Sequence, residues 1–179
     1  MSRKRPRDER PKPAIRVVFH KLSDQRHVLE VIHADGRAEQ VECATRSYLV
    51  HDLLHYAVEA QAQLTRGFWG SLAGGKTLEQ MNDRAGSAMS DASDEMMLIE
   101  LIVGALSATV KGRSPAEIVM GLRRNADAIE GALPEWLTEG FVAKVQARMH
   151  GLMGHWKATP FGGEMELPWP ELGPGQGPT

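Results

Sequence analysis

Two histidines with helical spacing give this sequence its clearest means of doing chemistry. They are His51 and His55, in the run His-Asp-Leu-Leu-His. On an α-helix, residues i and i+4 lie on one face, so both imidazole rings can point a nitrogen at the same cation. Glu59 continues this stripe one turn later. The spacing therefore predicts a metal-binding helix face, with Zn²⁺ or another divalent metal as the cofactor.

The same five residues resemble the zincin motif His-Glu-x-x-His of metallohydrolases. In that motif the glutamate is the general base that polarises a metal-bound water. Asp52 stands at the corresponding place, with a side chain one methylene shorter. The resemblance implies that Asp52 is the catalytic base of a metal-dependent hydrolase. Because the shorter carboxylate reaches less far, it could instead orient one of the histidines.

A zinc site needs at least one further ligand. Glu59 lies on the histidine stripe, but ~12 Å along the helix axis from His51. Glu100 is the stronger candidate, because it interrupts the apolar run Met96–Val103. A carboxylate inside an apolar helix is costly unless it is paired or coordinated. We therefore expect Glu100, or else Glu59, to complete the site with the two histidines.

A purely structural interpretation of these residues stays open. In it, the two histidines are half-buried, hydrogen-bonded side chains at the edge of the core. Glu100 would then pair with an arginine such as Arg123 or Arg124. The two interpretations differ in where Glu100 lies, so its position relative to the imidazoles separates them.

The segment that carries the histidines is expected to form a helix from about Ser47 to Leu64, with Ser47 as its N-cap. On a helical wheel its apolar side chains gather on one arc, and the two histidines fall just beside that arc. The helix is therefore expected to bury this arc in the core. The apolar residues are Leu49, Val50, Leu53, Leu54, Ala57, Ala60 and Leu64.

Strand patterns precede this helix. Alternating or β-rich sequence covers residues 15–20, 27–33 and 38–43. The pair Asp35-Gly36 between the last two runs is typical of a two-residue hairpin loop. We therefore expect a three-stranded antiparallel meander over about residues 14–43, which needs helices to cover its apolar face.

Three further helices are expected after the histidine helix, at about residues 93–111, 114–131 and 135–150. The first is apolar almost all round, which is typical of a buried core helix. The second opens with Ser114-Pro115-Ala116-Glu117, a capping box with proline at the first helical position. The chain is therefore predicted to have an α+β fold, in which the meander is followed by, and packed against, three to four α-helices.

Composition divides the chain into one domain and two polar ends. Residues 14–160 are expected to form a single domain with one core. Residues 1–13 are a basic arm expected to be disordered, and residues 161–179 are a Gly/Pro-rich tail expected to be largely disordered. Since the net charge is only −2, contact with nucleic acid is expected only through the arm, over residues 3–12.

Targeting signals are also missing from the sequence. It contains one cysteine, no secretory signal and no apolar run long enough for a bilayer. We therefore expect a cytoplasmic protein without a membrane partner.

A longer resemblance covers the histidine helix and the segment after it. Residues 47–59 (SYLVHDLLHYAVE) and 67–75 (GFWGSLAGG) are similar to an uncharacterised bacterial family, in which an HDLxHxxVE helix precedes a GFWGxLAxG loop. The resemblance spans about residues 14–85 and supplies no activity. It implies a small cytoplasmic bacterial protein in which helix and loop act as a unit, with Phe68 and Trp69 beside the histidines.

Two other functions are open to this sequence. The histidine helix and Phe68-Trp69 could form the surface by which a non-catalytic adaptor or regulatory protein binds a protein partner. Residues 70–77 also match the phosphate-binding pattern G-x-x-x-x-G-K-[ST]. A P-loop needs a buried strand before it and a long helix after it, and neither is expected here. We therefore expect residues 66–92 to be a Gly-rich loop with a short helix near residues 77–82.

Overall fold

The computed structural model describes residues 14–82, 94–107, 112–125 and 133–170. The predicted basic arm, residues 1–13, and the last part of the predicted tail, residues 171–179, lie outside the described residues. In chain order the elements are β1 (Ile15–Lys21), β2 (Arg26–His33), β3 (Ala38–Ala44), α1 (Thr45–Ala62), α2 (Phe68–Ala73), α3 (Leu78–Asn82), α4 (Asp94–Ser107), α5 (Pro115–Asn125), α6 (Glu139–Ala158) and β4 (Glu164–Trp169).

The sheet is antiparallel throughout, with the strand order β3-β2-β1-β4. Its first three strands form the predicted meander, and the α+β class is confirmed. The fourth strand was not expected, because residues 164–169 fall in the segment predicted to be a disordered tail. Buried and exposed residues alternate along it, as in a strand with one face on the core. Pro168 is tolerated because β4 pairs only with β1 and so forms an edge of the sheet.

The turn between β2 and β3 is one residue longer than predicted. The amide of His33 donates to the carbonyl of Arg37 at 2.8 Å, and the amide of Gly36 donates to the carbonyl of His33 at 2.9 Å. The loop therefore has three residues, with Gly36 last at a φ of 89°. That left-handed conformation is the one a three-residue loop places after a type I turn, so the Asp-Gly pair indicated the hairpin but not its length.

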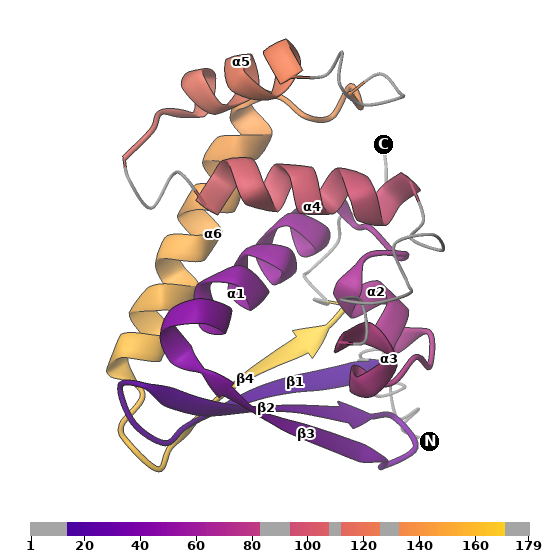
Figure 1. Cartoon of the computed structure of the whole chain (residues 1–179), viewed down its shortest axis with the longest axis vertical. Helices are drawn as coiled ribbons and strands as arrows, with labels where there is room; N and C mark the ends of the chain where they lie inside the picture. The colour runs from indigo at the N-terminus through magenta and orange to yellow at the C-terminus, as the bar shows by residue number, and fades with distance from the viewer. Residues whose placement is uncertain (1–13, 83–93, 108–111, 126–132, 171–179) are drawn as a thin grey trace, which may run out of the picture.

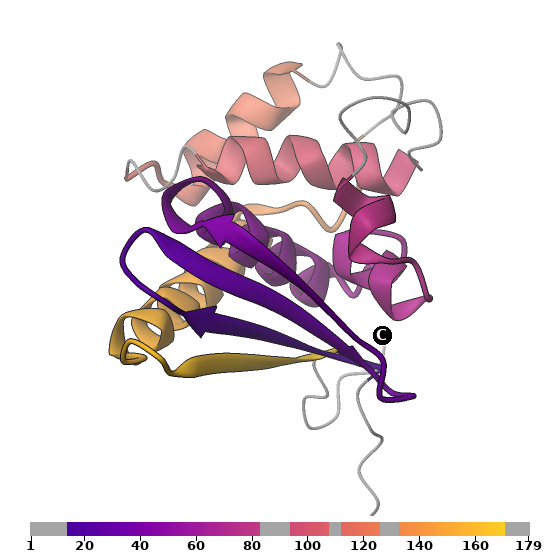
Figure 2. The ribbon, with the colours of Figure 1, turned by 60° about the horizontal axis from the view of Figure 1, so that its bottom comes forward.

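Helices cover one face of the sheet, as Figures 1 and 2 show from two directions. Helix α1 lies over the sheet, with α2 and α3 beside it at one end of the strands (Figure 1). Helix α4 packs on α1, and α6 packs on both α1 and α5. No helix within the described ranges is long and apolar enough to cross a membrane.

Helix α1 is buried on two sides. Leu49, Leu53 and Tyr56 pack in a cluster with residues of the sheet and of α2. Residues 54, 57 and 58 pack in a second cluster with α4, α5 and α6. As a result, every residue from Leu53 to Glu59 is buried, including the polar ones. The second histidine of the predicted stripe lies inside this stretch.

The expectation that the helix after residue 93 is buried on all sides is wrong. In α4, Ile99, Ile102 and Leu106 are fully buried, whereas Met97 is 52% exposed. One face of α4 therefore packs and the other meets solvent, because α1 occupies the central position. This arrangement leaves the polar residues of α4 free to lie at the margin of its contact with α1.

Of the two predicted helix caps, one is confirmed and the other is wrong. The capping box of α5 is confirmed: the amide of Ser114 donates to Glu117 Oε2 at 2.7 Å, and the amide of Glu117 donates to Ser114 Oγ at 3.3 Å. Ser47 is not the N-cap of α1, because β3 leads directly into the helix at Thr45. The Thr45 hydroxyl instead lies 3.2 Å from Nδ1 of the buried His27.

Candidate metal centre

The packing of α4 on α1 places Glu100 across from both histidines of α1. Oε1 of Glu100 lies 3.3 Å from Nε2 of His55, and Oε2 lies 3.8 Å from Nε2 of His51. Each of the three side chains offers one ligand atom, and these atoms all lie within 4.8 Å of one another. The structure therefore brings together three of the residues that the sequence named as metal ligands.

His51 forms the outer side of this cluster. Its side chain is 45% exposed, and its Nδ1 lies 3.5 Å from Oδ1 of Asp52. The carboxylate of Asp52, and after it that of Glu100, raises the pKa of His51 to about 9. Because a carboxylate only accepts hydrogen bonds, Asp52 favours a proton on Nδ1, and at neutral pH the raised pKa keeps a second proton on Nε2. The other ring nitrogen, Nε2, faces Glu100.

His55 forms the inner side and is 1% exposed. Its Nδ1 lies 3.3 Å from Oε1 of Glu59, which again places a proton on Nδ1. Its Nε2 makes no hydrogen bond to any described residue, although Glu100 is close to it. Burial lowers the pKa of His55, but Glu100 and Glu59 outweigh it and hold the pKa above its ordinary value.

Glu100 is 44% exposed on its side chain, so the expectation that it is buried in an apolar helix is wrong. Its expected place beside the histidines is nevertheless the observed one. His51, and after it His55, holds the pKa of Glu100 far below its usual range, so this side chain is an anion at neutral pH. The cluster is thus closed on the side of the core by His55 and open to solvent at His51 and Glu100.

Glu59, the other ligand candidate, lies on the Nδ1 side of His55 and has no exposed surface. Its carboxylate also accepts hydrogen bonds from the backbone amides at the start of α2. Oε1 accepts from Phe68 at 2.8 Å, and Oε2 accepts from Trp69 at 3.0 Å and Gly70 at 3.3 Å. Glu59 therefore caps α2 and orients His55, and its oxygens do not face the Nε2 atoms.

Two glycines permit this close approach of α2 to α1. A Cβ atom at Gly67 would lie 2.3 Å from the carboxyl carbon of Glu59 and 2.6 Å from a methyl carbon of Ile99. A Cβ atom at Gly70 would lie 2.3 Å from the carbonyl oxygen of Thr65. A side chain at Gly67 would therefore push the start of α2 away from Glu59, and one at Gly70 would push it away from the backbone of Thr65.

Asp52, the predicted catalytic base, contacts the ring nitrogen of His51 that faces away from Glu100. Its backbone carbonyl also accepts a hydrogen bond from the indole nitrogen of Trp69 at 3.3 Å. This placement matches the orienting role that its short side chain suggested. A base acting on a metal-bound water would have to lie on the Nε2 side of the ring.

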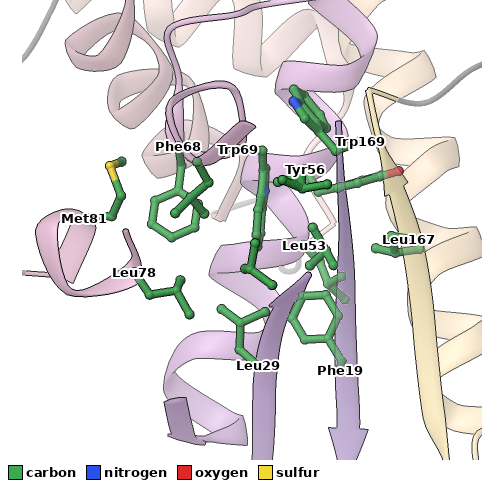
Figure 3. Packing of buried hydrophobic residues seen from close by; sticks show 14 of the residues in the cluster. Phe19, Leu29, Leu53, Tyr56, Phe68, Trp69, Leu78, Met81, Leu167 and Trp169 are labelled. Carbon is green, nitrogen blue, oxygen red and sulfur yellow. The ribbon is translucent and has the colours of Figure 1, made fainter. Parts of the chain in front are cut away.

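The Phe68-Trp69 pair lies in the core next to these residues. Trp69 is fully buried and Phe68 is 8% exposed, and Trp69 stands between Phe68 and Tyr56 in Figure 3. The ring of Phe68 also lies 5.9 Å from that of His55, between centroids. Helix α1 and the segment after it thus form one packed unit, and the two aromatic rings offer little surface to a partner.

Sequence reasoning missed the backbone amides of Phe68, Trp69 and Gly70 as partners of Glu59. The available signal was the spacing of Gly67 and Gly70 around the aromatic pair, which permits close approach of backbone to a side chain. The phosphate-binding pattern over residues 70–77 contains Gly70 but not Gly67. Its first residues are helical and follow α1 and not a strand, so the structure lacks the setting of a P-loop.

Comparison with known proteins finds no family model, no curated protein and no solved structure that matches this chain. The similarity of residues 47–59 and 67–75 to a bacterial family therefore stays a prediction. The function has to be argued from the geometry of the cluster.

Proposed function

We propose that this chain binds a divalent transition metal, zinc in the first instance, through His51, His55 and Glu100. The observation that carries the proposal is the convergence of one ligand atom each from His51, His55 and Glu100, which all lie within 4.8 Å of one another. The buried Nε2 of His55 lies 3.3 Å from Oε1 of Glu100, outside good hydrogen-bond geometry. A metal ion would bind this nitrogen and the carboxylate together.

The separations of the donor atoms support a single metal ion. Zinc binds nitrogen and oxygen ligands at about 2.0–2.2 Å, so two ligands of one tetrahedral ion lie ~3.4 Å apart. Glu100 lies 3.3 Å from one Nε2 and 3.8 Å from the other. Because the ligand atoms are spread over as much as 4.8 Å, binding one ion requires side-chain rotations, which are open to His51 and Glu100 since both are about half exposed.

The surroundings of both histidines support the same assignment. Metal-bound histidines generally donate their other ring N–H to a carboxylate or carbonyl, which fixes the tautomer and the ring orientation. Here Asp52 lies at Nδ1 of His51, and Glu59 lies at Nδ1 of His55. Each Nε2 is thereby left to face Glu100 with its lone pair when the ring is neutral.

Three protein ligands and an open side resemble catalytic zinc sites more than structural ones, because the fourth position is left for water. A hydrolytic reaction would also need a base within reach of that water. Asp52 contacts Nδ1 of His51, so we assign it an orienting role. We therefore propose metal binding without assigning a reaction.

The test is a zinc titration of tag-free protein, followed by calorimetry, together with elemental analysis of the dialysed complex. We expect one zinc per chain in the wild type and a loss of binding in His51→Ala and His55→Ala. His150→Ala is the matched control, because His150 is exposed on α6 and outside the cluster. A wild-type protein that binds no zinc, or a His51→Ala protein that binds it equally well, would overturn the proposal.

A further inference from the structure

One buried carboxylate joins the proposed metal centre to the start of α2. Glu59 has no exposed surface, and among the described residues it accepts from one imidazole and three backbone amides. The imidazole belongs to a proposed metal ligand, and the amides are those of Phe68, Trp69 and Gly70. The same two oxygens therefore serve two structures that are separate in the sequence.

These contacts satisfy both oxygens of the carboxylate. Oε1 lies between Nδ1 of His55 and the amide of Phe68, and Oε2 lies between the amides of Trp69 and Gly70. Since a carboxylate has about four acceptor positions, Glu59 has little freedom to rotate without losing a bond. Its position is set by α2, and the ring of His55 is in turn set by Glu59.

We infer that Glu59 is a positioning residue for the metal, through which α2 sets the donor nitrogen of His55 and metal binding in turn stabilises α2. The inference rests on the proposed metal site. Compared with a neutral imidazole, one whose Nε2 binds a metal has less electron density in the ring, so its Nδ1–H is a stronger donor. The 3.3 Å contact between Nδ1 and Glu59 is then strengthened, and the carboxylate is held more firmly where it caps α2.

The coupling has to act in both directions, because binding free energies are linked reciprocally. If α2 holds Glu59 in the orientation that suits a metal-bound His55, then disturbing α2 must lower the affinity for the metal. Phe68 adds a second contact on the same path, since its ring packs against that of His55. The packing at Gly67 keeps Glu59 and the start of α2 in direct contact.

Amide hydrogen exchange, measured by NMR with and without saturating Zn²⁺, tests the inference in the wild-type protein. We expect zinc to slow exchange at Phe68, Trp69 and Gly70 by about fivefold or more. The amide of Phe141 is the matched control, because it also donates to a capping side chain, that of Thr138 at the start of α6. Phe141 should be slowed clearly less. Zinc binding that depends on His51 but leaves the three α2 amides unchanged would overturn the inference and spare the metal site.

Glu59→Gln tests the positioning role from the other side. An amide group must turn its NH₂ toward one of the two donor pairs, either His55 with Phe68 or Trp69 with Gly70. We therefore expect zinc affinity to fall by about 10–100-fold and the zinc-dependent slowing at α2 to disappear. Glu117→Gln removes the carboxylate that caps α5 and should leave zinc affinity unchanged. Unaltered zinc affinity in folded Glu59→Gln would overturn the inference. If this variant does not fold, the exchange measurement on the wild type decides alone. A wild type that binds no zinc overturns the proposed function and the coupling together.

Discussion

His51 and His55 lie on successive turns of α1 with their ring centroids 4.6 Å apart. Two imidazoles at this distance repel each other when both are protonated. Glu100 lies against both rings from α4 and compensates that repulsion. Glu100 can therefore face either two protonated imidazoles or one metal ion bound to both rings, and these two states respond differently to pH.

Replacing Glu100 removes a proposed ligand and the charge shared by the two rings. In Glu100→Gln we expect zinc affinity to fall at least about 10-fold and the pKa of His51 to move down from about 9 toward its ordinary value. Isothermal titration with zinc and an NMR pH titration of the His51 ring protons measure the two effects. Glu135→Gln, which changes an exposed carboxylate outside the cluster, should alter neither.

The protonation of His51 predicts how pH acts on the metal-free protein. Its pKa is raised from 6.5 to about 9, so its stabilising contribution is complete below pH 6.5 and is lost as pH rises to 9. Glu100 contributes in the opposite direction, since its lowered pKa makes its contribution complete above its ordinary pKa. Urea unfolding without metal should therefore show the cluster's contribution declining between pH 6.5 and 9. His51→Ala should reduce this decline to the share that comes from His55, whose pKa is also raised.

Zinc binding should have the reverse dependence on pH. Zinc needs the neutral imidazole, so binding displaces the proton that His51 holds at neutral pH. We expect affinity to rise by about tenfold for each proton displaced over each pH unit between 6 and 8. Competition with a chelator of known affinity measures this slope. A flat profile would show that protonated His51 is not a ligand.

Gly70 is predicted to be intolerant of a side chain. The added methyl of Gly70→Ala would lie 2.3 Å from the carbonyl oxygen of Thr65, and overpacking of this kind costs ~1–3 kcal/mol. Gly104→Ala is the control, because Gly104 lies in α4 with no atom within 4 Å of the added carbon. That change should stabilise the helix by ~0.5–1 kcal/mol. Urea denaturation of both variants checks that the free energy of unfolding falls in the first and rises in the second.

Lys21 should matter for the junction of α6 and β4. Its ammonium donates to the carbonyl of Trp156 at 3.0 Å and to that of Thr159 at 2.8 Å, at the end of α6. Lys21→Met keeps the aliphatic stem but removes the charged donor from both carbonyls, so we expect a loss of ~1.5–3 kcal/mol in the free energy of unfolding. Lys144→Met, at an exposed position of α6, should change stability little. Equal effects of the two variants would contradict this role.

Local patterns predicted many of the elements. The alternation over residues 15–43 indicated the meander, and Ser114 and Glu117 indicated where α5 begins, because both signals depend on residues only a few positions apart. The strand at residues 164–169 was missed because Pro168 and the surrounding glycines are typical of a coil. Whether proline is acceptable there depends on the strand being at the edge of the sheet, which no local pattern contains.

The candidate site divides in the same way. The spacing of His51 and His55 specified one helix face for both rings, since helical geometry relates residues i and i+4 wherever the helix lies. For Asp52 the sequence left two roles open, a catalytic base or a residue that orients a histidine. The sequence did not show which carboxylate faces Nε2 and which faces Nδ1, because Glu59 and Glu100 reach the rings from different directions. Only the packing of α4 and α2 on α1 distinguished them.

The amino-acid sequence therefore specified the helix, the histidine pair and the residue types of the candidate metal ligands, since these depend on residue type and on backbone geometry over one or two turns. The tertiary structure specified the rest. It places Glu100 opposite both imidazoles, and it places Glu59 in contact with the amides of α2. These contacts join segments far apart in the chain. Their positions follow from how the apolar faces of all the helices pack together, which is a property of the whole core.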